Sequence, residues 1–156
     1  MFYRTIGEAY LPIAFRIAHA VAPKAKLYYN DYNLEYADAK AVAARKIVRL
    51  VQSYGVKIHA VGLQGHLVSE STPTQSKPAP SQKILEKALR LFTSAGVDVA
   101  YTEVDVRFNT PATPAKYKVQ ADAYSRVTKS CLAVKRCVGI TLWVSSTNVI
   151  PVCHSF

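Results

Sequence analysis

Two carboxylates and an imidazole occupy positions in this 156-residue chain where they could do acid–base or nucleophilic chemistry. Glu103 and Asp105 are two residues apart on a predicted strand, so their side chains share one face of it. One of them could act as a nucleophile or a base that its neighbours orient. The alternative is a structural ion pair with Arg107, which falls on the same face.

His66 follows another predicted strand and could serve as a base or a ligand, although a lone histidine is more often a hydrogen-bonded part of the scaffold. A metal site needs at least two or three convergent ligands, and only His66 and carboxylates are available, so we expect no metal. Cys131 and Cys137 could form a local disulfide, as in an oxidising compartment, or remain two buried thiols. Their spacing alone leaves both readings open.

Amide and aromatic side chains accumulate near the same strand ends, and they favour a sugar ligand. The amides are Asn30 and Gln64, and the rings belong to Tyr28, Tyr29, Tyr32, Tyr36 and Trp143. Aromatic rings can stack on sugars, whereas phosphate would call for glycine-rich turns or convergent Arg and Lys. The fingerprints of dinucleotide-binding and P-loop folds do not follow any predicted strand.

The elements that must position these groups recur about every forty residues as a helix, a glycine turn and a strand. Helices are predicted over 5–21, from 38 to 54, from 81 and from 114, and strands over 25–30, 56–63, 97–106 and 138–143. Residues 5–8 read as a capping box, with a kink or a helix start near Pro12. Gly55 and Gly96 stand where helices need a left-handed end.

Alternating helices and strands predict a parallel sheet with right-handed crossovers. The nearly continuous apolar runs of the strands are typical of strands covered on both faces. Four such units make half of a (β/α)8 barrel or a small doubly wound sheet. In either fold the carboxyl ends of the strands meet at one rim, which would bring the groups above together.

Composition excludes several classes of protein. The chain is 50% apolar and only 19% charged, which rules out intrinsic disorder. No run approaches the ~18 apolar residues of a membrane span, and the first residues lack a secretory signal pattern. The net charge is +10, but the basic residues are scattered singly or in pairs, so we expect neither nucleic acid nor a membrane as partner.

Four segments of the chain together resemble the glycoside hydrolase family 10 endo-1,4-β-xylanases, most closely the secreted fungal ones. They are 27–33 (LYYNDYN), 62–67 (GLQGHL), 101–107 (YTEVDVR) and 139–143 (GITLW). The resemblance implies a partial TIM barrel, its second half, with strands five to eight and their helices. Residues 1–143 would be a partial catalytic domain, and 144–156 a tail outside the family pattern.

The family cleaves xylan with retention of configuration, and the resemblance implies that Glu103 is the nucleophile. His66 would then hydrogen-bond Glu103, and Asp105 would hold the imidazole. Gln64 and Trp143 would line the subsite next to the scissile bond. Other implied features are Asn30 and Tyr32 near the cleft, a Cys131–Cys137 disulfide, no cofactor and an extracellular location.

The family takes its acid/base glutamate from a Trp-Asp-x-x-Asn-Glu motif on strand four, a motif that this chain does not contain. We therefore expect these 156 residues alone to be weakly active or inactive. Two alternatives remain open, a non-catalytic remnant that binds xylo-oligosaccharides and an inert partial gene product. A half barrel would also leave open sheet edges through which the chain could self-associate.

Overall fold

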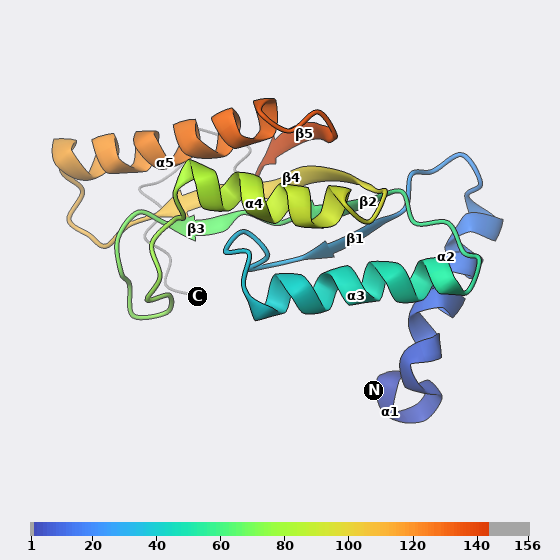
Figure 1. Ribbon diagram of the computed structural model, residues 1–156. Coiled ribbons are helices and arrows are strands. Elements are labelled where there is room, and N and C mark those ends of the chain that lie inside the picture. Colours follow the sequence, from blue (N-terminus) through green and yellow to red (C-terminus); the bar gives the residue numbers. More distant parts are fainter. Residues whose placement is uncertain (1, 144–156) are drawn as a thin grey trace.

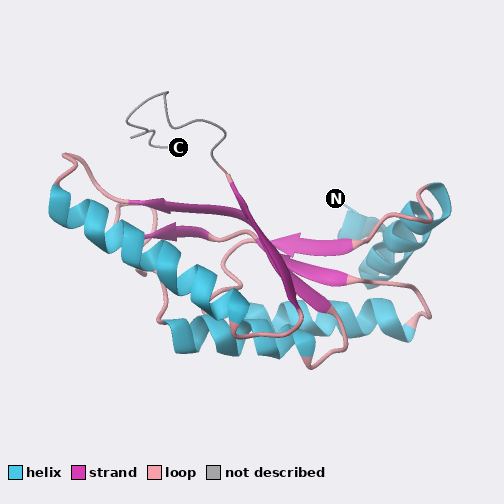
Figure 2. Cartoon of the chain, turned by 90° about the horizontal axis from the view of Figure 1, so that it is seen from above, coloured by secondary structure: helices cyan, strands magenta, loops and turns pink. Residues whose placement is uncertain are grey.

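The structure is a computed structural model that describes residues 2–143. In it the chain forms a five-stranded parallel sheet with helices on one face (Figure 1). The sheet twists, and α3, α4 and α5 lie along the same side of it (Figure 2). The elements in chain order are α1 (Phe2–Ile6), the 3-10 helix η1 (Gly7–Ala9), α2 (Tyr10–Val21), β1 (Tyr28–Asp31), α3 (Ala39–Ser53), β2 (Ala60–Leu63), β3 (His66–Val68), α4 (Gln82–Thr93), β4 (Asp98–Arg107), α5 (Pro114–Leu132) and β5 (Cys137–Leu142).

Strands β2 and β3 are two parts of one interrupted strand. β2 pairs with the first half of β4 and β3 with its second half, while Gln64 and Gly65 separate them. β1 pairs with the other side of β2, and β5 pairs with β4. The sheet thus runs β1, then β2 with β3, then β4, then β5. All of its carboxyl ends point the same way, as the sequence predicts for half of a barrel.

The three long helices begin and end at the residues that local chemistry selects. Asp38, Ser81 and Thr113 cap α3, α4 and α5 by accepting hydrogen bonds from backbone N–H groups of the first turn. Gly55 and Gly96 take the left-handed backbone expected of them after α3 and α4, with φ of +67° and +81°.

The N-terminal helical segment departs from the prediction of a capping box over 5–8. Gly7 has a φ of +73°, which interrupts the helix, and α2 begins at Tyr10 without a side-chain cap. Pro12 is the third residue of α2. A backbone N–H at this position has no intrahelical acceptor, so the N–H that proline lacks costs the helix no hydrogen bond. The helix therefore starts near Pro12 as expected, but glycine and not a capping box sets its beginning.

The core lies between the sheet and α3–α5. Its largest fully buried side chains include Tyr101, Phe92, Leu63, Leu85 and Val48. β2, in the middle of the sheet, is buried throughout, but β1 and β5 are partly exposed, so the prediction of strands covered on both faces is wrong for these two. In the described part of the chain these two strands have no second layer over them, because α3–α5 pack on a single face. None of the helices in this part is both long and apolar enough to cross a membrane.

Candidate active site

Glu103 lies in the middle of β4, with its carboxylate held from two sides. Asn30 of β1 donates from Nδ2 to Glu103 Oε1 at 2.8 Å. Asn30 is fixed in turn by Thr102, whose hydroxyl donates to Asn30 Oδ1 at 2.6 Å. Because Tyr29 packs against the core, its neighbour Asn30 projects from the opposite face of the sheet, away from the helices.

The His66 imidazole bridges the two carboxylates of β4. His66 Nε2 lies 3.1 Å from Glu103 Oε2, and Nδ1 lies 2.8 Å from Asp105 Oδ1. The three side chains keep 28%, 20% and 19% of their surface exposed for His66, Glu103 and Asp105, so solvent reaches all of them. Arg107 does not take the alternative role of their partner, since its guanidinium donates to Gln75 Oε1 at 3.2 Å.

The interruption between β2 and β3 places His66 at this position. Gly65 has a φ of +79°, a left-handed conformation that turns the chain here. Glycine adopts it readily because it has no Cβ atom. The Glu103 N–H donates to the Gln64 carbonyl at 2.9 Å, and the Asp105 N–H donates to the Gly65 carbonyl at 3.2 Å. The sequence predicts a strand over 56–63 that ends before His66, whereas in the structure the strand resumes after the turn as β3.

A third carboxyl lies beneath the turn. Glu35, in the loop between β1 and α3, is fully buried, and its Oε1 accepts from the Gly65 N–H at 2.6 Å. Burial raises the pKa of this carboxyl above its usual range, against the opposing influence of backbone N–H groups, His66 and Lys40. Sequence reasoning did not single out Glu35, although a lone acid between apolar and aromatic residues was a signal for burial.

Trp143 contacts His66, and Gln64 lies two residues before it in the chain. The Trp143 ring meets the imidazole edge to face, with ring centroids 5.6 Å apart, and 62% of the residue is exposed. Gln64 is half-buried and directly precedes the Gly65 turn. The structure thus brings five of the predicted site residues into contact, namely Asn30, Glu103, His66, Asp105 and Trp143. An exposed indole beside a carboxylate offers a surface on which a sugar ring could stack.

Tyr32 belongs to a neighbouring cluster. Its ring lies against the Lys40 ammonium, which is 3.3 Å from the ring centroid. Lys40 also pairs with Asp31 at 3.0 Å and donates to the Tyr32 carbonyl at 2.6 Å. Lys40 is thus engaged by both a ring and a carboxylate, although its side chain stays 36% exposed. Its place in the first turn of α3, at the same end as the β1 terminus, was the available signal.

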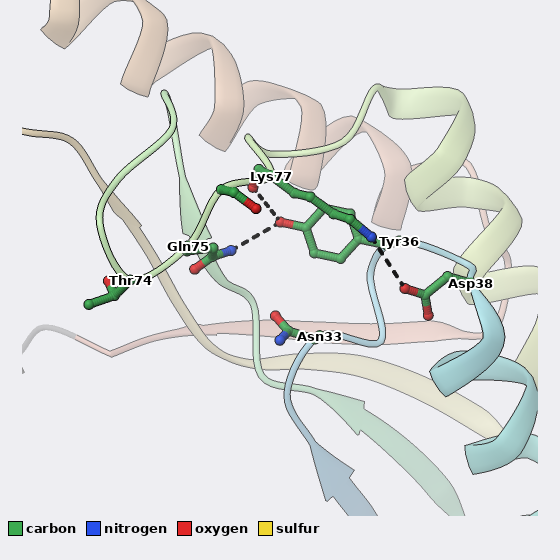
Figure 3. Close-up of a pocket in the computed structure, with 7 residues that line it drawn as sticks. Asn33, Tyr36, Asp38, Thr74, Gln75 and Lys77 are labelled. Carbon is green, nitrogen blue, oxygen red and sulfur yellow. Dashed lines mark hydrogen bonds and ion pairs between the residues drawn. The ribbon is translucent and has the colours of Figure 1, made fainter.

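A groove of about 260 Å³ lies beside this cluster, between the loop after β1 and the loop after β3 (Figure 3). Tyr36 forms one wall, and its hydroxyl donates to the Lys77 carbonyl at 2.9 Å and accepts from Gln75 Nε2 at 3.0 Å. Gln75 also donates to the His66 carbonyl at 3.3 Å. Gln75 was not singled out, because the polar stretch around it has no periodicity to place it.

Two further expectations concern cysteine and metal chemistry. Cys131 of α5 and Cys137 of β5 form a disulfide, with their Cα atoms 5.2 Å apart, which confirms the pairing that the family resemblance implied. Among residues 2–143, no three His, Cys, Asp or Glu side chains are grouped so that they could hold a metal ion.

Comparison with known proteins adds an independent line of observation. The sequence profile of glycosyl hydrolase family 10 matches residues 1–148. Endo-1,4-beta-xylanase A of Fusarium oxysporum f. sp. lycopersici is 59% identical over 143 residues, which are 92% of this chain and 44% of that protein. Endo-1,4-beta-xylanase 2 of Aureobasidium pullulans is 62% identical over 145 residues, covering 92% and 40%.

A solved structure shows the same relation. The family 10 xylanase of Bispora sp. MEY-1, crystallised with xylobiose, superposes with a TM-score of 0.82 at 35% sequence identity, over 92% of this chain and 42% of that one. The fold is therefore part of the barrel of these enzymes. The chain spans about two fifths of the length of the relatives it matches.

Proposed function

The chain belongs to glycosyl hydrolase family 10, and from that premise we propose that it is the part of an endo-1,4-β-xylanase that carries the nucleophile, with Glu103 in that role. The observation that carries this proposal is the carboxylate of Glu103 held by Asn30 and His66 while a fifth of its side chain stays open to solvent.

A retaining glycosidase needs a carboxylate that is fixed and ionised at the moment of attack. One oxygen of Glu103 attacks the anomeric carbon and forms a glycosyl ester, while the bond from that carbon to the leaving oxygen breaks. Asn30 Nδ2 donates to one oxygen of Glu103 and His66 Nε2 lies 3.1 Å from the other, so the carboxylate is held in place from two sides. Asp105 holds the other nitrogen of the His66 ring and so orients the imidazole against Glu103. Asn30, Gln64, Tyr32 and Trp143 would contact the sugar.

The same chemistry limits what these 156 residues can do alone. The leaving oxygen of a xylan chain needs a proton from a second carboxyl group, about 5–5.5 Å from the nucleophile in retaining enzymes. Asp105 is already engaged with His66. Without that acid the general-acid contribution of roughly 10²–10⁴-fold is absent. We therefore expect weak hydrolysis of xylan, or none.

An activated substrate separates the nucleophile from the missing acid. We would use a xylobioside with fluorine next to the anomeric carbon and dinitrophenolate as leaving group. Dinitrophenolate departs without a proton, so attack by Glu103 alone should leave a fluoroxylobiosyl ester on the chain. Mass spectrometry of the intact chain and of its peptides should locate this label on Glu103.

Two variants control the labelling experiment. Glu103→Gln should abolish the label. Asp98→Asn should keep it, because Asp98 is on the same strand but pairs with Arg136 at the opposite end. A label on any other residue, or equal labelling of Glu103→Gln and the parent chain, would refute the assignment of Glu103.

A binding function is favoured by the exposed Trp143 ring beside the carboxylates. Trp143 is the only tryptophan of the sequence, so its fluorescence reports on this place directly. Titration with xylotriose should shift the emission, whereas maltotriose should not. A response to both sugars, or to neither, would contradict a xylo-oligosaccharide site that includes Trp143.

We expect the isolated chain to self-associate through its sheet edge. Within residues 2–143, β5 pairs with β4 alone, and Val138 and Leu142 on it are exposed. Light scattering across a range of concentrations should show dimers or larger species. Leu142→Lys should shift them toward monomer, and Val119→Lys, at an exposed position of α5, should not. A monomer at every concentration would exclude this association.

The Cys131–Cys137 disulfide supports an extracellular place of action, because such bonds persist in oxidising compartments. Quantifying free thiols in the chain purified from its source would test this. Reduced Cys131 and Cys137 in freshly isolated material would contradict it.

A further inference from the structure

Glu35, in the loop between β1 and α3, combines three properties. It is 0% exposed, its Oε1 accepts a short hydrogen bond of 2.6 Å from the Gly65 N–H, and within residues 2–143 its Oε2 is buried without a hydrogen-bond partner. A buried polar atom without a partner destabilises the fold. Retaining such an atom therefore calls for an explanation beyond stability.

The donor of this bond, Gly65, is the residue that determines where His66 lies. Gly65 is fixed at its carbonyl by the Asp105 N–H and at its N–H by Glu35. A Cβ on Gly65 would come within 3.0 Å of Val104, so the turn packs closely on β4 and has little freedom to shift toward it. The contact with Glu35 thus adds to β4 a second support of this turn, from the loop between β1 and α3.

We propose that Glu35 is a positioning residue of the active site, whose buried carboxyl oxygen holds Gly65 and thereby places the His66 imidazole between Glu103 and Asp105. The chemical meaning of that placement rests on the proposed role of Glu103 as nucleophile. Glu35 itself does not touch the carboxylates that His66 bridges. It acts through one peptide group, 30 residues away in sequence.

The environment of Glu35 supports this role. The charged groups that influence it are Lys40 of α3 and His66 of β3, and both favour its ionised form, as do the two backbone N–H groups. Burial outweighs them and raises the pKa of Glu35, which favours the neutral acid. A neutral acid supports Gly65 through its carbonyl oxygen, and glutamine offers the same oxygen in the same shape.

Three variants of the full 156-residue chain separate positioning from bulk and stability. Glu35→Gln keeps an oxygen that can accept from the Gly65 N–H. Glu35→Leu keeps most of the side-chain volume but removes this acceptor. Tyr101→Phe is the matched control, because it deletes a buried hydrogen bond to Ser130 in the helix-facing core and does not touch Gly65. Solution NMR would measure the exchange rate of the Gly65 amide proton and the ring-nitrogen resonances of His66.

We expect Glu35→Leu to speed exchange of the Gly65 amide by about tenfold or more, the equivalent of one lost buried hydrogen bond, and to shift the His66 ring nitrogens. Glu35→Gln and Tyr101→Phe should leave both signals near those of the parent. The proposal is overturned if Glu35→Leu leaves them unchanged, if Glu35→Gln changes them as much, or if Tyr101→Phe does.

A measurement on the parent chain covers the case in which Glu35→Leu does not fold. The Gly65 amide should exchange as slowly as the amides of Gly55 and Gly96, whose N–H groups are bonded to backbone carbonyls. Rapid exchange at Gly65 alone would overturn the proposal. Because neither readout depends on turnover, failure of Glu103 labelling would leave this test intact, and failure here would leave the labelling result intact.

Discussion

Replacing Gly62 by alanine should disrupt the active site by steric overlap alone. Gly62 lies in β2 between β1 and β4, and a Cβ there would overlap Asn30 Oδ1 and come within 2.8 Å of Thr102 Cγ2. These two side chains are bonded to each other, and Asn30 then donates to Glu103. A methyl group can fit only by displacing Asn30 from the nucleophile.

The structure also supplies a matched control. Gly139 lies in β5, and a Cβ there would meet nothing within 4 Å. Each substitution should raise the free energy of unfolding by the same ~0.5–1 kcal/mol, because alanine has less backbone freedom to lose on folding than glycine. This contribution cancels when the two variants are compared. Overpacking at Gly62 then costs about 1–3 kcal/mol. Gly62→Ala should therefore melt ~2–12 °C below Gly139→Ala, at about 2–4 °C per kcal/mol for a chain of this size.

The assay is thermal unfolding followed by circular dichroism, at one protein concentration because self-association would otherwise shift the midpoint. Covalent labelling of Glu103 by the fluorinated xylobioside would then be compared between the two folded variants. Gly62→Ala should label more slowly than Gly139→Ala. Equal midpoints and equal labelling rates would show that Asn30 is not held as the structure has it, and would refute the reasoning.

Three further predictions concern stability. Replacing Cys131 and Cys137 by alanine should lower the free energy of unfolding by about 2 kcal/mol, the loop-closure value for so short a loop, and an unchanged urea midpoint would contradict this. Tyr101→Phe should cost about 1 kcal/mol in the same measurement, because the buried bond to Ser130 is lost, and a stabilised variant would be inconsistent with that bond. The pKa of Glu35 is raised in the folded state, so the stability that its protonation contributes is complete below the unfolded carboxyl pKa of about 4.3 and is lost as pH rises through the folded pKa. Glu35→Gln should therefore flatten the fall in urea midpoint as pH rises above that value, and parallel pH profiles of the variant and the parent would exclude this linkage.

Features decided by neighbouring residues could be predicted from the sequence. The predicted helices agree with α3, α4 and α5 because caps such as Ser81 and glycines such as Gly96 act within one turn. The capping box was wrong for a related reason, since Gly7 adopts a positive φ that breaks the helix there. The predicted strand from residue 56 begins only at Ala60, because pairing with β1 and β4 sets its start.

The candidate site was predictable in part, and mainly through resemblance. Their spacing placed Glu103 and Asp105 on one face of a strand. It did not decide whether they serve catalysis or form a structural ion pair with Arg107. The family motif pointed to His66, and the structure brings His66 to both carboxylates. Glu35 and Lys40 were not predicted, because each acts across a contact that the sequence around it does not encode.

What the sequence by itself determined is the alternation of helices and strands, the parallel direction of the sheet and the family to which the chain belongs. Only the tertiary structure decided that Asn30 meets Glu103 across 73 positions, and that the Glu35 carboxyl lies under Gly65. The physical reason is that caps and turns depend on a few adjacent residues. Contacts between distant segments depend on strand register and helix packing, which the whole core sets at once.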